Sequence, residues 1–313
     1  MMEGQDPKFA YLTPRAKLVL LGAIILVSSG FFVILGSVLG SWIYDVNIME
    51  DPNALNDLDN SSTLSALKLM QIFQHVGMFI VPPLVLAYLV SQNPLKSLGL
   101  VKTANIQAYI YSGLIIFLAL PLINWMVVIN GHLALPEFMS SIEIWMKETE
   151  ETAKRFTESF LIMSTTQDLA VNLLMVAIIP AIGEELLFRG LIQRLFINWT
   201  RSVHWGILIA SILFSALHMQ FFGFLPRMML GILFGYLFLW SGTLWVPILC
   251  HFINNGSAVV FAYLEQRDLM WFNAENLGAE NQDTMITIAC TIAISGLLYL
   301  IYKKGKELQT IQV

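Results

Sequence analysis

Long uninterrupted apolar runs dominate the pattern of hydrophobic and polar positions along this chain. Each run approaches the roughly 20 residues that a helix needs to cross the hydrocarbon of a bilayer. The runs cover residues 18–43, 65–90, 106–129, 170–198, 203–222, 226–240, 243–263 and 284–302. In lipid only helices and closed barrels satisfy their own backbone hydrogen bonds, and runs of this length indicate helices. The pattern therefore predicts an all-α, polytopic transmembrane helix bundle of about eight spans.

Composition supports a membrane protein and excludes a soluble domain. Of the 313 residues, 57% are hydrophobic and 12% are charged, and the mean hydropathy is +0.69. An ordinary soluble domain carries about 25% charged residues. The net charge of -5 is spread over the loops, so no basic patch indicates nucleic-acid binding. Cys250 and Cys290 lie inside apolar runs, where free cysteines act as small buried hydrophobes.

Basic residues concentrate in the segments that would lie on one side of the membrane. They are Lys8, Arg15, Lys17, Lys96, Lys102, Arg194, Arg201, Lys303, Lys304 and Lys306. The opposite loops are acidic: residues 44–64 hold five acids and no basic residue, and residues 264–283 hold five acids and one arginine. Short cytoplasmic loops are enriched in Lys and Arg. We therefore expect a multi-pass integral membrane protein with both termini cytoplasmic, in the plasma (inner) membrane if the cell is bacterial.

The segment from Asn130 to Gln167 is predicted to contain an amphipathic helix at the membrane surface. Its apolar residues recur at helical spacing, namely Ile142, Trp145, Met146, Ala153, Phe156 and Phe160. Charged residues fill the positions between them, which is typical of interfacial helices. Such a helix could be a packed connector or a gate for substrate, and the sequence leaves both open.

Ionisable side chains inside apolar runs are the candidates for function. Each costs roughly 2.5–3.5 kcal/mol on insertion scales, so it is rarely retained without a role. The candidates, including one amide, are Glu184, Glu185, Arg189, His218, His251 and Asn255. His251 and Asn255 are one helical turn apart and share a face, and Glu185 and Arg189 can pair in the same way. Glu184 lies about 100° around the helix from Glu185, so it is expected to face elsewhere and remain unpaired.

A carboxylate, two imidazoles and an amide in an apolar cavity suit the hydrolysis of a peptide bond. A carboxylate can act as general base on a water molecule, while histidine and asparagine can donate hydrogen bonds to the developing oxyanion. Zinc binding is the competing use, with Glu184, His218 and His251 as three ligands and water as the fourth. The sequence has no HExxH motif, which favours a site without metal.

Three motifs resemble those of a known family. Residues 184–190, Glu-Glu-Leu-Leu-Phe-Arg-Gly, are similar to the EExxxR motif of the CAAX protease and bacteriocin-processing (CPBP, or Abi) family, which is related to the type II CAAX prenyl endopeptidases. Phe214 to His218 matches the FxxxH motif of that family, and His251 to Asn255 matches its HxxxN motif. The motifs follow the family order, and the resemblance covers roughly residues 170–260.

The resemblance implies a role for each matched residue. Glu184 would activate water, and His218 would help to orient that water. His251 and Asn255 would stabilise the oxyanion, with Glu185 and Arg189 supporting the site. Both metal-dependent and metal-free mechanisms have been proposed for the family. We expect no cofactor; if a metal such as zinc is bound, its ligands would be Glu184, His218 and His251.

We predict an intramembrane endopeptidase, a CAAX-prenyl-endopeptidase-like hydrolase that acts on a peptide or membrane-protein substrate and contacts the lipid bilayer. Two alternatives remain: a non-catalytic scaffold or bacteriocin self-immunity protein that retains the motifs, and a proton-coupled transporter. The absence of repeated halves weighs against the transporter.

The chain is divided into three expected regions. Residues 1–168 would hold three spans and the amphipathic helix, residues 169–263 the catalytic CPBP-like core, and residues 264–313 the last loop, the final span and a basic tail. In the first region, His75 follows Gln71 by one turn. We interpret His75 as an interhelical hydrogen-bonding group rather than a catalyst, because membrane helices use polar side chains in this way.

Overall fold

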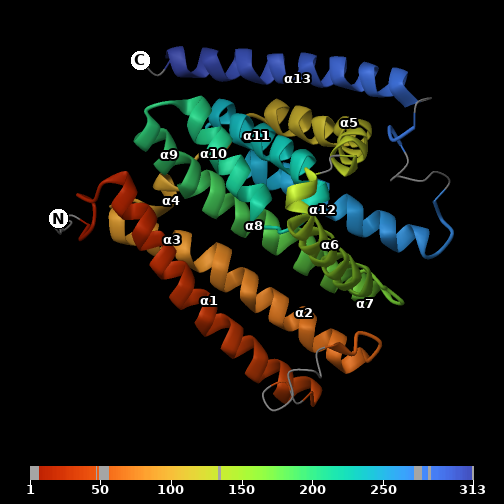
Figure 1. The fold of residues 1–313 in the computed structure, drawn as a ribbon. Helices are drawn as coiled ribbons and strands as arrows, with labels where there is room; N and C mark the ends of the chain where they lie inside the picture. Colours follow the sequence, from red (N-terminus) through yellow and green to blue (C-terminus); the bar gives the residue numbers. More distant parts are fainter. Residues whose placement is uncertain are drawn as a thin grey trace.

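A computed structural model of the chain describes residues 7–46, 48, 56–132, 135–270, 277–280 and 283–311. Within these residues every regular element is a helix, which confirms the predicted all-α class. Figure 1 shows the helices gathered into one bundle, with α13 along its edge.

Seven helical segments of the described chain are long and apolar enough to cross a membrane. They are α1 (Pro14–Tyr44), α2 with α3 (Ser61–His75 and Val81–Val90), α5 (Ile106–Gly131), α7 to α9 (Thr166–Asn172, Ile179–Glu185 and Gln193–Thr200), α11 (Phe224–Ser241), α12 (Trp245–Glu265) and α13 (Thr284–Ile311). These seven candidate spans indicate an integral multi-pass membrane protein.

The fifth expected span, residues 203–222, is shorter than predicted. Helix α10 (Val203–Ala216) has only 14 residues, and the chain then turns through Met219, which has a positive φ of 54°. The Ser215 hydroxyl donates to the Phe224 carbonyl at 2.6 Å, bracing this turn. The apolar run had been extended by Met219 and Phe221, which are outside the helix. His218 therefore lies in the turn after α10 rather than inside a span.

One face of the bundle brings both ends of the described chain together. The Phe9 amide donates to the Leu89 carbonyl at 3.1 Å, and the Leu244 amide donates to the Gly99 carbonyl at 2.9 Å. Lys304 of α13 donates to the Gln107 side chain. We call this the termini face, formed by residues 7–13, 91–105 and 241–245 with the last turns of α9 and α13 (Figure 1).

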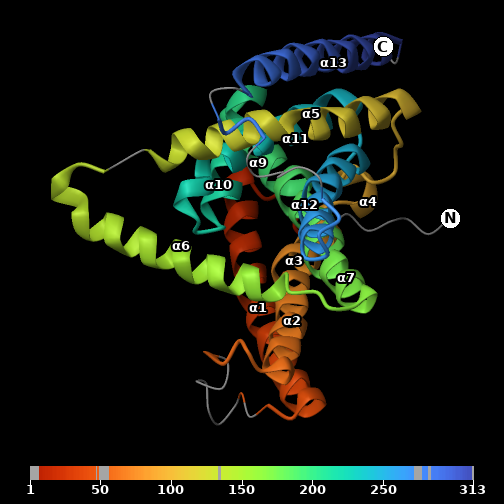
Figure 2. The same ribbon diagram turned by 90° about the vertical axis from the view of Figure 1, so that its right-hand side faces the viewer.

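Helix α6 (Ser140–Phe160) crosses the opposite end of the bundle (Figure 2). The predicted amphipathic helix is thus present, and every one of its residues is at least partly exposed. Two hydrogen bonds hold the C-terminal end of α6. Asn172 Nδ2 donates to the Phe160 carbonyl at 2.6 Å, and Gln266 Nε2 donates to the Leu161 carbonyl at 2.7 Å. We call this the α6 face; it comprises α6 with residues 161–165, 217–223 and 266–270.

Three π-helical segments interrupt the helices that surround the centre of the bundle. They are Val76–Ile80, between α2 and α3, and Leu173–Ile178 and Leu186–Ile192, on either side of α8. Such segments are rare and are frequent at functional sites, because they redirect side chains and carbonyls. The first ends at Ile80, and Pro82 and Pro83 follow in the first turn of α3.

Candidate active site

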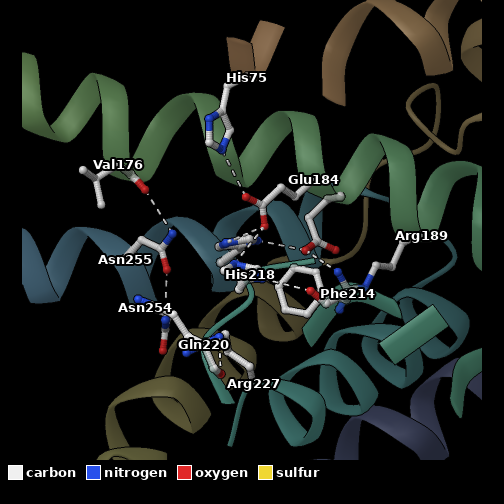
Figure 3. A network of polar contacts seen from close by, with 12 residues as sticks. His75, Val176, Glu184, Arg189, Phe214, His218, Gln220, Arg227, Asn254 and Asn255 are labelled. Atoms are coloured by element: carbon white, nitrogen blue, oxygen red, sulfur yellow. Dashed lines mark hydrogen bonds and ion pairs between the residues drawn. The ribbon is translucent and has the colours of Figure 1, made fainter. Parts of the chain in front are cut away.

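Glu184 of α8 lies at the centre of a cluster of three histidines. Its side chain is 6% exposed. Oε2 is 3.9 Å from Nε2 of His251 and 4.0 Å from Nε2 of His218, while Oε1 is 3.3 Å from Nε2 of His75 (Figure 3). The four side chains come from α2, α8, α12 and the turn after α10, so the fold assembles the cluster from distant segments. Glu184, His218 and His251, which are three of the four predicted catalytic residues, are thus brought together.

Glu185 faces away from Glu184 and holds His251 in place. Its Oε1 accepts a hydrogen bond from His251 Nδ1 at 2.9 Å and one from Arg189 Nη1 at 2.8 Å. Glu185 is 0% and Arg189 1% exposed, and the second guanidinium nitrogen of Arg189 donates to the Gly231 carbonyl at 3.0 Å. The predicted Glu185–Arg189 pair is confirmed. Because Nδ1 of His251 is occupied by Glu185, its Nε2 is left to face Glu184.

His218 is oriented by its own backbone. Its Nδ1 lies 2.9 Å from the Phe214 carbonyl, one turn earlier, so Nδ1 carries the proton and Nε2 points its lone pair towards Glu184 when the ring is neutral. The Phe214 ring also packs edge-on against the Phe188 ring, with 5.2 Å between the ring centroids. The Arg189 Cζ atom lies 4.6 Å from the centroid of the Phe214 ring. Phe214 therefore supports both the histidine turn and the buried ion pair.

Asn255 lines the same cavity from α12, one turn after His251. Its Nδ2 donates to the Val176 carbonyl at 3.0 Å. The residue that would donate to this carbonyl in an α-helix is Pro180, which has no N–H. Asn254 Nδ2 donates to Oδ1 of Asn255 at 3.0 Å. The amide is thus fixed, and one proton of its Nδ2 remains for a ligand.

A cavity of 530 Å³ opens beside this cluster towards the α6 face. Glu184, His75, His218 and Asn255 supply its main polar groups. Its walls are largely apolar, and they include Met78, Phe79, Met175, Phe188, Leu217 and Val259. Phe156 and Phe160 of α6 line it from the outside. An extended apolar peptide segment could therefore reach Glu184 by passing under α6.

His75 is the site residue whose role the sequence did not reveal. It was interpreted as an interhelical hydrogen-bonding group, and it does bond between helices, but its partner is Glu184. Gln71 Nε2 lies 3.2 Å from His75 Nδ1. The only signal in the sequence was a polar pair one turn apart on an apolar run.

The donor atoms do not match a zinc site as they stand. Ligand atoms about 2.1 Å from a tetrahedral zinc lie roughly 3.4 Å from one another, whereas Glu184 Oε2 is 3.9 and 4.0 Å from the two imidazole nitrogens. Across the described residues, no group of three or more His, Cys, Asp or Glu side chains is arranged to hold a metal ion. We therefore derive no step through a metal.

Comparisons with known proteins agree with the motifs. Residues 166–257 match the family model of the type II CAAX prenyl endopeptidases, described as Rce1-like. The uncharacterized protein YpbD of Bacillus subtilis (strain 168) is 31% identical over 86 residues, covering 26% of this chain and 41% of the relative. The match thus spans less than half the length of that relative, and no solved structure matches significantly. The matched residues 166–257 contain Glu184, His218, His251 and Asn255, and they are similar to the Rce1-like domain of the type II CAAX prenyl endopeptidases, a peptidase family.

Proposed function

We propose that this chain is an intramembrane endopeptidase that cleaves a peptide bond with a water molecule activated by Glu184. One observation carries the proposal. Oε2 of Glu184 is buried and has no hydrogen-bond partner among the described residues, yet it faces two imidazole nitrogens at 3.9 and 4.0 Å beside an open cavity. A buried oxygen without a partner is costly, and polar atoms more than about 3.5 Å apart are candidates for a bridging water.

In the proposed reaction this water donates one hydrogen bond to Glu184 Oε2 and the other to His218 Nε2. Glu184 removes a proton as the water oxygen bonds to the peptide carbonyl carbon. The carbonyl oxygen becomes the oxyanion of a tetrahedral intermediate. When the C–N bond breaks, Glu184 returns its proton to the leaving amine, so the carboxylate is regenerated and the products are a carboxylic acid and an amine.

His251 and Asn255 would stabilise the oxyanion. Because Nδ1–H of His251 donates to Glu185, a proton on Nε2 would be the one that His251 offers to the substrate oxygen. The free Nδ2 proton of Asn255 supplies a second donor. Preorganised donors of this kind are worth roughly 10²- to 10³-fold each in rate.

The test compares wild type with Glu184→Gln, which keeps the shape of the side chain and removes the base. Both proteins are purified in detergent, checked for equal thermal stability and incubated with a library of quenched fluorescent peptides, with and without chelator. Glu158→Gln, at an exposed position of α6, is the matched control. We expect Glu184→Gln to lose at least about 10²-fold in cleavage rate, while the control retains wild-type cleavage.

Two results would contradict the proposal. Cleavage by Glu184→Gln at the wild-type rate would exclude Glu184 as the base. A stably folded wild type that cleaves no library peptide would favour the non-catalytic scaffold. Inhibition by chelator would instead retain the peptidase and revive a metal at Glu184, His218 and His251.

A further inference from the structure

The cavity beside Glu184 opens at only one of the two faces described above, and the two faces differ strongly in charge. The cavity is lined by α6 and by Leu217, His218 and Gln220 of the α6 face. Asn130, at the end of α5, holds the turn that contains Leu217, His218 and Gln220. Its side chain donates to the Phe221 carbonyl at 2.8 Å and accepts from the Leu225 amide at 2.9 Å. The opening is therefore on the side of the bundle away from the termini face.

The termini face is basic. Ten of the 17 Lys and Arg residues fall in the described parts of four segments that end there, residues 7–17, 91–105, 194–204 and 303–311, which together hold one acid. The described residues of the segments at the opposite side, within 44–64, 132–168 and 264–283, hold four basic residues and 14 acids. Lys and Arg near the ends of spans set orientation, and they remain in the cytoplasm.

We propose that the site opens to the extracytoplasmic side of the membrane and that its substrate is a peptide segment presented on that side. This inference rests on the proposed peptidase function. The orientation follows from the basic termini face, and the opening follows from the position of α6. A cytoplasmic peptide would meet the basic end of the bundle, whose residues do not line the cavity, and would reach Glu184 only after crossing the bilayer.

Cleavage by sealed vesicles of known orientation tests the proposal. The probe is a quenched, membrane-impermeant peptide that the detergent-solubilised protein cleaves. We expect right-side-out vesicles to cleave it at once and inverted vesicles to cleave it only after detergent is added. The opposite pattern would overturn the inference while leaving the peptidase function intact, since loss of that function would abolish cleavage in detergent too.

A labelling measurement tests the orientation without requiring activity. In a background with Cys250→Ala and Cys290→Ala, a single cysteine is introduced by Lys154→Cys on α6 or by Lys96→Cys on the termini face, both at exposed positions. In intact cells an impermeant maleimide should label the Lys154→Cys protein and spare the Lys96→Cys protein. The reverse labelling would show that the cavity opens to the cytoplasm.

An independent observation supports a second proposal, which concerns His75. Its Nδ1 accepts from Gln71 Nε2 at 3.2 Å, which places the ring proton on Nε2, 3.3 Å from Glu184 Oε1. With Oε1 held in this way, Oε2 is turned towards His218 and His251. We infer that His75 and Gln71 position the Glu184 carboxylate, although both lie outside the family domain at residues 166–257.

Steady-state kinetics separate positioning from a purely structural role. Within the proposed peptidase function, His75→Ala should lower kcat roughly 10- to 100-fold with little change in KM. His75→Gln, whose amide can also donate to Oε1, should recover most of the loss. An active wild type with an equally active His75→Ala variant would refute the positioning role, whereas an inactive wild type would refute the peptidase function.

A double-mutant cycle tests the His75–Glu184 contact even in an inactive protein. The shifts in Tm for His75→Ala and Glu184→Ala should not add in the double variant, because each removes the same contact. Gln74→Ala, one residue away on the cavity wall, serves as the control and should add to Glu184→Ala. Additive shifts for His75→Ala would show that the two side chains are not coupled.

Discussion

Glu184 and Glu185 are adjacent in the sequence but serve different partners. The turn of about 100° per residue in a helix points Glu185 to Arg189 and His251, while Glu184 faces the cavity. Both carboxylates are buried, but only Glu185 has a cationic partner that is charged under all ordinary conditions. Helical spacing predicted that the two carboxylates face different ways, but the expectation that Glu184 stays unpaired is wrong, because its Oε1 lies 3.3 Å from His75 Nε2.

Removing the Arg189 guanidinium should destabilise the fold. Arg189→Met leaves Glu185 buried without its cation, and breaking a buried ion pair from one side costs about 3–5 kcal/mol. Thermal unfolding in detergent would measure the loss. Arg155→Met, at an exposed position on α6, should shift stability by no more than about 0.5 kcal/mol. Equal stability of the two variants would contradict a structural role for the buried pair.

Loss of the Asn255 amide should affect the reaction more than the fold. Asn255→Ala removes the proposed oxyanion donor, so kcat should fall roughly 10²- to 10³-fold, measured on a cleaved peptide. Asn254→Ala, which removes only the group that donates to Asn255 Oδ1, should have a smaller effect. If Asn254→Ala proves the more damaging of the two, Asn255 is not the donor.

At the scale of elements, span two approaches α8 closely because Gly183 has no side chain. A Cβ atom at Gly183 would lie 2.9 Å from both Phe79 Cβ and Ile80 Cγ1. This close contact brings the end of α2 against α8 and allows His75 to reach Glu184. The interaction joins the first region of the chain to the family domain.

A larger residue at position 183 should therefore separate the two helices. Gly183→Val is expected to cost about 1–3 kcal/mol through overpacking and to lower cleavage by displacing His75. Gly30→Val on α1, where a Cβ meets no atom within 4 Å, controls for the effect of valine in a span. The close approach would be refuted by a Gly183→Val protein with wild-type stability and cleavage.

The elements also show what sequence reasoning can and cannot reach. The three motifs were found because helical spacing and motif order are local properties of the chain, and their residues do meet at Glu184. The end of α10 was placed too late because apolar residues such as Phe221 continue the hydrophobic run past the helix. The role of His75 could not be derived, because its contact depends on how α2 packs against α8, 109 residues away in sequence.

On the scale of the whole molecule, the fold surrounds a polar cluster with apolar helices. The residues of the basic termini face do not line the cavity beside this cluster, whereas α6 lies exposed across the other end of the bundle and lines it (Figure 2). The division of the chain into three regions at residues 168 and 263 stays a prediction.

The origin of the oxygen added to the product is the most direct test of water activation by Glu184. A cleavable peptide is mixed with excess enzyme in ¹⁸O-labelled water, and the new carboxyl group is analysed by mass spectrometry after a single turnover. Attack by water predicts one ¹⁸O atom in the product of this first turnover, and no product from Glu184→Gln. A first-turnover product without ¹⁸O would mean that the oxygen came from an enzyme carboxylate through a covalent intermediate, which would contradict the proposed mechanism.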